Sequence, residues 1–170
     1  MVAQDLFRLF EWFYEGKLDV QRLNYGIITL LPKSADATKI QQYRPICLLR
    51  CPYKLITKVL DNRVAIYADK LISKCQNASI KHRNIMDGIL TLHEVLHLTH
   101  HKKKVGVVLK LDFEKAFDTI EHQAILDILK AKGFGDRWIN WIKMLFTSAS
   151  SAILLNGVPG KKFYCLRGVR

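Results

Sequence analysis

Apolar residues occur along this chain in two patterns, at helical spacing and in short continuous runs, and the pattern separates predicted helices from predicted strands. Apolar positions three and four residues apart predict amphipathic helices at 5–15, 53–71 and 84–101. Runs of β-branched and apolar residues predict strands at 25–31, 105–113, 151–155 and 163–166. A further extended piece begins at Arg44, because the residue before a proline avoids the helical region. Since helices and strands are mixed without strict alternation, the pattern indicates an α+β fold.

Polar residues and glycines predict where several of these elements begin and end. Gly16 and Gly133 follow helical patterns and are typical of helix C-terminal stops. Asp118 and Glu121 have the spacing of a capping box, which predicts a helix capped by Asp118 and running to Lys132. Asp136 is expected to begin one more helix.

Composition narrows the class of partner. The 170 residues carry 27 Lys and Arg against 15 Asp and Glu, a net charge of +12 that favours polyanions such as nucleic acid. No apolar run is long enough for a transmembrane helix, and residues 1–13 do not read as a secretory signal, so no membrane association is expected. The four cysteines lack paired CxxC spacing, which favours a reducing intracellular location, nuclear or cytoplasmic, over a zinc knuckle.

Asp112 is the strongest catalytic candidate. It ends the apolar run of residues 105–113, and a carboxylate in that position can hold a hard cation such as Mg²⁺. A strand-end aspartate that begins a turn is the alternative interpretation.

The stretch 107–120, VVLKLDFEKAFDTI, resembles the first catalytic-aspartate motif of LINE-type (non-LTR) retrotransposon reverse transcriptases. Further matches follow in the family's order. They are Asn24–Ile28 with Leu31–Lys33, Tyr43–Ile46, Tyr53-Lys54, Asn62-Arg63, Gln76 with Arg83–Asp87, Leu155–Gly157 and Arg167–Arg170. An ordered series of short matches is far more specific than any one motif.

The resemblance implies a role for each matched residue. Asp112 would be a catalytic ligand of Mg²⁺ in two-metal chemistry, with the backbone carbonyl of Phe113 as a second ligand. Lys33 and Arg44 would bind the triphosphate of the incoming dNTP, and Phe117 would be the steric gate that excludes a ribose 2′-hydroxyl. Gln76 and Arg83 would contact the template. The implied partners are an RNA template, a DNA primer and dNTPs.

The resemblance also implies an architecture: a reverse-transcriptase-like fingers and palm fragment, with helices packed on a small, mainly antiparallel sheet. It divides the chain into an N-terminal amphipathic helix and lead-in (1–23), a fingers-like region (24–104) and a truncated palm (105–170). The family's Tyr-x-Asp-Asp motif does not occur in these residues. The chain is therefore expected to be an N-terminal fragment that lacks polymerase activity by itself.

The sequence departs from the family pattern at three positions. Ser79 replaces a usual aromatic, His82 replaces a usual glycine before Arg83, and Arg50 replaces a common asparagine. These changes bear on template handling.

Two alternative functions remain open. The charge is also compatible with a non-enzymatic basic RNA-binding or interaction module. His93-Glu94-x-x-His97 matches HExxH, in which two histidines one helical turn apart bind Zn²⁺ and the glutamate acts as general base. A zinc hydrolase is the weaker alternative, because no third ligand follows at the family's spacing and three lysines lie next to the motif.

Overall fold

The computed structural model describes residues 2–169, so Arg170 of the C-terminal sequence match lies outside the described residues. The chain divides into two compact units. The first comprises residues 1–58 and 115–170, and the second comprises residues 59–114. Each unit is described by itself.

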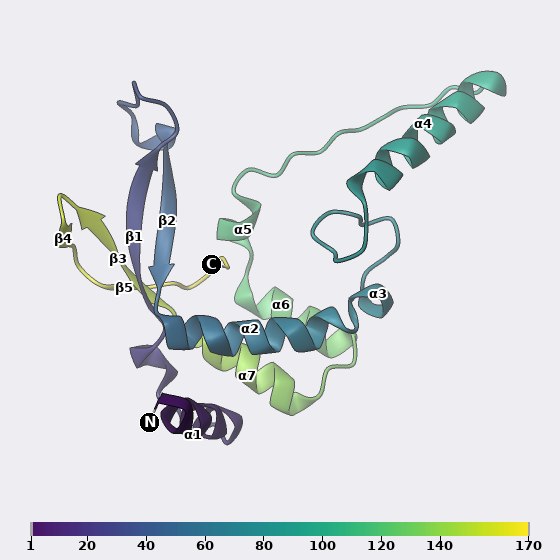
Figure 1. Ribbon diagram of the computed structural model, residues 1–170. Helices are drawn as coiled ribbons and strands as arrows, with labels where there is room; N and C mark the ends of the chain where they lie inside the picture. Colours follow the sequence, from purple (N-terminus) through teal and green to yellow (C-terminus); the bar gives the residue numbers. More distant parts are fainter. Residues whose placement is uncertain (1, 170) are drawn as a thin grey trace. The chain divides into compact units, whose positions relative to one another are not determined.

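The first unit is organised around a five-stranded sheet (Figure 1). Its strands are β1 (Tyr25–Pro32), β2 (Tyr43–Leu49), β3 (Ser150–Leu155), β4 (Val158–Pro159) and β5 (Phe163–Tyr164). The order is β2-β1-β3-β4, and β5 also pairs with β3. The β1–β3 pair is parallel and the other pairs are antiparallel. The predicted α+β fold with a mainly antiparallel sheet is confirmed.

Local sequence explains the turn that joins β3 to β4. Asn156 and Gly157 have φ values of 49° and 81°, the left-handed conformation that asparagine and glycine adopt most readily. Consecutive residues of this kind form the tight turns whose twist suits a hairpin. The strands predicted at 151–155 and 163–166 correspond to β3 and β5, which pair antiparallel, although β5 ends at Tyr164. Strand β4, directly after the turn, was not predicted.

Helices supply the apolar core of the first unit. They are α1 (Val2–Tyr14), the first half of α2 (Cys51–Ala65), α6 (His122–Ala131) and α7 (Asp136–Thr147). The unit also contains the one-turn helix α5 (Ala116–Thr119) and two 3₁₀ turns, η1 (Val20–Arg22) and η2 (Ile40–Gln42). Helices α6 and α7 lie side by side (Figure 1). Phe13 of α1 and Trp141 of α7 are both buried, with ring centroids 5.8 Å apart. Each such buried side chain contributes about 1.5–3 kcal/mol of hydrophobic stabilisation.

A buried asparagine joins the sheet to α7. Asn24 precedes β1 and is fully buried. Its side-chain amide donates to the carbonyl of Leu145 at 2.7 Å and to the hydroxyl of Ser148 at 2.9 Å. Because a buried amide is costly unless it is hydrogen-bonded, these contacts fix the start of β1 against the end of α7.

The second unit contains the C-terminal half of α2 (Cys51–Ala65), the short helix α3 (Ala68–Leu71) and α4 (Ile85–His101). Asn84 caps α4 by accepting a hydrogen bond from the backbone N–H of Met86 at 3.0 Å. The predicted helix 84–101 is therefore confirmed. Among residues 2–169, no helix combines the length and the apolar character needed to cross a bilayer.

The predicted central strand at 105–113 is wrong. This segment is extended but pairs with no strand among the described residues. Its apolar side chains lie open to solvent, with Val105 fully exposed and Leu109 75% exposed. An apolar run supplies the side chains of a buried strand, but a strand also requires neighbours that satisfy its backbone N–H and C=O groups.

Two helix predictions also need correction. The helix predicted at 53–71 ends at Ala65 and resumes as α3, because the chain turns at Ile66 and Tyr67. Asp118 does not cap a helix but lies inside α5, and α6 begins after Glu121. The backbone of Glu121 is extended (φ −79°, ψ 131°), which interrupts the predicted continuous helix. The spacing predicted that a helix begins in this region but assigned its N-cap to Asp118, whereas Glu121 holds the N-cap position of α6.

Candidate functional site

Asp112 and Phe113 lie at the end of the extended segment 105–113 in the second unit. Both side chains are exposed. The Asp112 carboxylate and the Phe113 carbonyl are hard oxygen donors, the type that Mg²⁺ prefers. Magnesium is usually held by one or two carboxylates, with waters and substrate phosphates completing its coordination, so these two groups fit part of such a site.

Lys33 and Arg44 meet at one end of the β1–β2 hairpin in the first unit. Arg44 is the register partner of Leu31, and the backbone N–H of Lys33 continues the ladder by donating to Gln42 at 2.8 Å. Side chains alternate along a strand, so Lys33 and Arg44 are diagonal neighbours on the same face. Both side chains are exposed, and the Lys33 ammonium donates to the Gln41 carbonyl at 2.9 Å.

Phe117 lies in α5 of the first unit and is 76% exposed. Its backbone is held although its ring is open to solvent, because the carbonyl of Phe117 accepts a hydrogen bond from the N–H of Val169 at 2.8 Å. A ring displayed on a fixed backbone is available to contact a ligand.

Gln76 and Arg83 belong to one loop of the second unit. The Arg83 side chain is only 11% exposed. Its five N–H groups make five hydrogen bonds: two to one Asp69 carboxylate oxygen and one each to the carbonyls of Ile72, Ser73 and Gln76. A guanidinium has five N–H donors, and in Arg83 all five are used in these hydrogen bonds within the loop. This geometry gives Arg83 a structural role, and its template contact stays a prediction.

Two departures from the family pattern occur at unusual backbone positions of this loop. His82 stands where a glycine is usual and has φ of 68°, while Ser79 has φ of 62°. Residues other than glycine adopt this left-handed conformation at a cost of about 1–2 kcal/mol. The usual glycine before Arg83 therefore has a conformational explanation that the sequence alone did not reveal. The same loop borders a pocket of about 620 Å³, whose lining includes His82, Arg83 and Asp87.

The HExxH residues lie along α4 with their side chains exposed. The rings of His97 and His101 stack with centroids 6.4 Å apart. Among residues 2–169, no group of three or more His, Cys, Asp or Glu side chains is placed to hold a metal ion. The geometry thus offers no three-ligand zinc site on the described chain.

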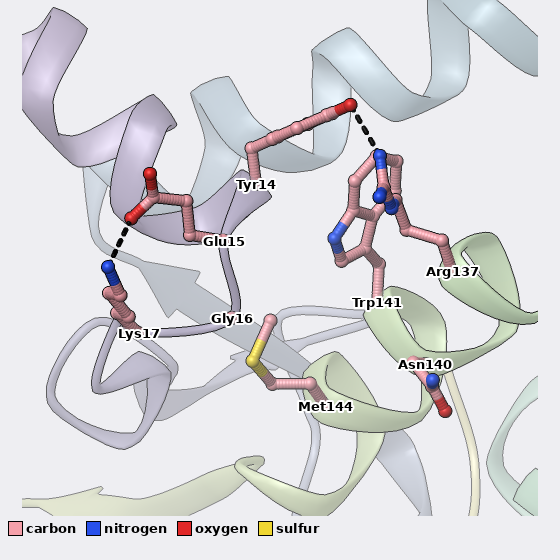
Figure 2. Close-up of a pocket in the computed structure, with 8 residues that line it drawn as sticks. All are labelled: Tyr14, Glu15, Gly16, Lys17, Arg137, Asn140, Trp141 and Met144. Carbon is pink, nitrogen blue, oxygen red and sulfur yellow. Dashed lines mark hydrogen bonds and ion pairs between the residues drawn. The ribbon is translucent and has the colours of Figure 1, made fainter.

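Sequence reasoning missed a pocket between α1 and α7 of the first unit, of about 680 Å³ (Figure 2). Arg137 lies over the Tyr14 ring, 4.9 Å from its centroid, and also donates to its hydroxyl. Trp141 packs beside Tyr14 with centroids 5.5 Å apart. Lys17 pairs with Glu15 at 2.8 Å, and this hydrogen bond raises the pKa of Lys17 above its ordinary value. No motif or residue spacing in the sequence indicates that these residues of α1 and α7 lie next to one another.

Sequence reasoning also left His122 and Gly168 without roles. The His122 ring nitrogen Nε2 lies 2.8 Å from the carbonyl of Gly168, and the ring stacks on Phe146 with centroids 4.4 Å apart. The match of residues 167–170 to the family marked Gly168, whereas nothing marked His122. The site residues thus form separate groups: Lys33 with Arg44 and Phe117 with 167–169 in the first unit, and Gln76 with Arg83 in the second.

Comparison with known families identifies the class of protein. Residues 31–170 match the reverse transcriptase (RNA-dependent DNA polymerase) family. The match covers most of the chain and includes every residue assigned to the candidate site, so the chain belongs to this family. Reverse transcriptases are polymerases that generally use divalent metal ions and bind nucleic acid.

The relatives specify the type of reverse transcriptase. The chain is 30% identical over 162 residues to the transposon TX1 uncharacterized 149 kDa protein of Xenopus laevis, covering 95% of the chain and 12% of that protein. It is 25% identical over 157 residues to the retrovirus-related Pol polyprotein from type-1 retrotransposable element R2 of Nasonia vitripennis, covering 92% of the chain and 15% of that protein. It is also 25% identical over 145 residues to the polyprotein from type-2 element R2DM of Drosophila melanogaster, covering 82% of the chain and 13% of that protein.

These matches confirm the resemblance to reverse transcriptases of LINE-type, non-LTR retrotransposons. The chain spans less than a sixth of the length of each of these three relatives.

Proposed function

We propose that this chain serves in RNA-directed DNA synthesis as part of a larger non-LTR retrotransposon polymerase, which extends a DNA 3′ end on an RNA template. The observation that carries this proposal is the match of residues 31–170 to the reverse transcriptase family. The resemblance of residues 107–120 to that family's first catalytic-aspartate motif supports Asp112 as a metal ligand and Phe117 as the steric gate.

The hairpin end of β1 and β2 supplies the binding site for the triphosphate of the incoming dNTP. Lys33 and Arg44 are exposed on one face of the hairpin, so both positive charges would attract the same bound phosphate group. Ammonium and guanidinium groups are suited to phosphate, and guanidinium binds it through two parallel hydrogen bonds.

Phe117 selects deoxynucleotides by its size. Its ring is exposed on a turn whose backbone is hydrogen-bonded, so a ribose 2′-hydroxyl at that position would collide with the aromatic ring. The deoxyribose of a dNTP presents only hydrogen there.

Asp112 and the carbonyl of Phe113 would hold a divalent metal ion such as Mg²⁺, which would supply Lewis-acid stabilisation of the negative charge that develops during nucleotidyl transfer. Waters, substrate phosphates and a further carboxylate would complete its coordination. The contribution of this chain is to offer two hard oxygen donors on consecutive residues.

The template partner is RNA, and its contacts include Gln76 and the Arg83 loop. The net charge of +12 supports binding of template and primer, and the binding should weaken as salt rises, because neutralised phosphates release their counterions. The intact protein acts inside the cell, in the nucleus or cytoplasm, where RNA templates and dNTPs are present.

Substitution of Asp112 tests the proposal. In the polymerase that contains this chain, Asp112→Ala should lower primer extension on an RNA template by at least about 10³-fold, because a metal ligand is lost from the reacting centre. Asp127→Ala is the matched control, since Asp127 is an exposed carboxylate of α6 that only accepts a hydrogen bond from Gln123 at 2.8 Å. Full extension activity in the Asp112→Ala protein would remove Asp112 from the mechanism.

The basic charge also favours a second candidate, a non-enzymatic RNA-binding module. Salt-dependent RNA binding with no primer extension by either the parent protein or its Asp112→Ala variant would favour this candidate.

A further inference from the structure

The turn that displays Phe117 is too short to be stable by itself. Helix α5 contains one turn, Ala116–Thr119, and begins after Lys115, whose φ is 51°. A single helical turn fixes several backbone dihedrals for very few hydrogen bonds, so isolated turns of this length do not persist in water. Contacts from elsewhere in the chain must hold it.

Residues 167–169 supply these contacts. The N–H of Val169 donates to the carbonyl of Phe117, and the N–H of Gly168 donates to the carbonyl of Ile120, both at 2.8 Å. Glu121 and Arg167 form an antiparallel bridge. We call residues 117–121 and 167–169 together the clasp. It joins segments about 50 residues apart in the sequence and includes the backbone of the gate residue itself.

Gly168 allows the clasp to close. Its φ is 82°, and a Cβ at this position would lie 2.7 Å from the carbonyl oxygen of Asp118, closer than real Cβ contacts occur. The backbone of the two segments therefore approaches at a distance that only glycine permits.

His122 connects the clasp to the core. A carbonyl only accepts hydrogen bonds, so Nε2 of His122 must carry the proton that it shares with Gly168 at 2.8 Å. The other side of the contact is apolar, because the imidazole stacks nearly parallel (7°) on Phe146 of α7. Phe146 follows Leu145, a buried residue of the first unit. His122 thus links three elements: the start of α6, helix α7 and residues 167–169.

We propose that His122 is a positioning residue for sugar selection: by holding Gly168 against α7, it fixes the clasp and with it the turn that presents Phe117 to the incoming nucleotide. This inference rests on the proposed function of Phe117 as the gate. His122 acts through Gly168 and does not itself touch the nucleotide. Loss of the His122 hydrogen bond would let the Phe117 turn shift and admit a ribose more readily.

The test compares four variants of the polymerase that contains this chain. His122→Leu removes the donor, His122→Gln replaces the ring with an amide donor, and Phe117→Ala removes the gate, alone and together with His122→Leu. The readout is the ratio of kcat/KM for a dNTP to that for the matching rNTP. His100→Leu, at an exposed histidine of α4, is the control for loss of an imidazole.

His122→Leu should lower this ratio about threefold to tenfold, the range that one hydrogen bond controls. His122→Gln should recover part of the loss. In the Phe117→Ala background, His122→Leu should change the ratio no further, because no gate remains to be positioned. An unchanged ratio in His122→Leu, or an equal fall with and without Phe117, would overturn the proposal.

Hydrogen exchange separates failure of the inference from failure of the gate itself. If Phe117→Ala leaves the ratio unchanged, the gate assignment is wrong, whatever His122 does. Exchange of the amides of Gly168 and Val169 then tests the clasp alone. His122→Leu should accelerate their exchange at least about tenfold and His122→Gln by less. Equal exchange in all variants would show that His122 does not hold the clasp.

Discussion

The stretch 107–121 contains two segments that differ in the hydrogen bonds they make. Residues 107–113, which end at Asp112 and Phe113, are extended, exposed and without a strand partner among the described residues. Residues 117–121 are held by hydrogen bonds to 167–169 and through them to His122. The more apolar segment thus has fewer hydrogen-bonding partners among the described residues, so local hydrophobicity does not decide which half of this motif is held by the rest of the chain.

This difference has a functional consequence. The segment that would select the nucleotide is held by hydrogen bonds from its own chain, whereas the segment that would hold the metal has no strand partner among the described residues. Preorganisation lowers the cost of positioning groups when substrate binds. Sugar selection and metal binding should therefore respond differently to changes in this chain.

Within the two segments compared, the largest effect is expected at Gly168. Gly168→Ala should destabilise the chain by about 2–4 kcal/mol, because it adds both a strained φ and a contact with the carbonyl of Asp118. Gly157→Ala is the matched control: its φ is 81°, almost the same, but nothing lies within 4 Å of its Cβ position. It should cost only the conformational part, about 1–2 kcal/mol. Equal losses in the two denaturant titrations would show that the clasp does not close as described.

Hydrogen exchange of the unsubstituted chain compares the two segments directly. The amides of 105–113 make no backbone hydrogen bond within the described chain, so they should exchange within about tenfold of an unfolded peptide. The amides of Gly168 and Val169 should exchange at least about tenfold more slowly than these. Mass spectrometry of peptic fragments measures both. If the amides of 105–113 were protected from exchange as strongly as those of the clasp, the two segments would not differ in hydrogen bonding as the structure describes.

The same contrast explains how much of the fold could be predicted from the sequence. Helix α4 and strand β1 were predicted nearly to their ends, because each has a clear local pattern and a local signal at one end, Asn84 and Pro32. The pattern is a helical period in α4 and a run of β-branched and apolar residues in β1. The strand predicted at 105–113 was wrong, because an apolar composition does not supply the neighbouring strand with which the backbone would have to pair. Asp118 was assigned as a cap from its spacing to Glu121, but spacing does not determine which residue adopts the extended conformation.

The candidate site divides in the same way. Asp112, Phe117, Lys33 and Arg44 were proposed from the resemblance to reverse transcriptases, and their roles stay predictions. His122 could not be found from the sequence, because its contact with Gly168 joins residues 46 positions apart. The buried guanidinium of Arg83 was equally hidden, since a sequence does not show which carbonyls an arginine will meet. Motifs therefore identified chemical groups, whereas the structure identified the residues that hold them.

The smallest effect is expected at Leu109, where a null result is the informative one. Leu109 is 75% exposed, so Leu109→Ala should change the free energy of unfolding by no more than about 0.5 kcal/mol. The same substitution at Leu126 of α6, which is 7% exposed, should cost about 2–5 kcal/mol. Denaturant titration of both variants measures the two changes in the free energy of unfolding. A cost at Leu109 close to that at Leu126 would mean that the run is packed in solution, contrary to the structure.

The same pair of leucines can then be compared in the polymerase that contains this chain. If Leu109→Ala is nearly neutral in the chain but costly in the larger protein, residues 105–113 acquire packing partners there. The apolar side chains would then serve a strand that forms only with those partners, and Asp112 would be positioned by the same step. If Leu109→Ala is neutral in both, the metal ligand must be positioned by some other contact, and the exposed apolar residues would need a different explanation.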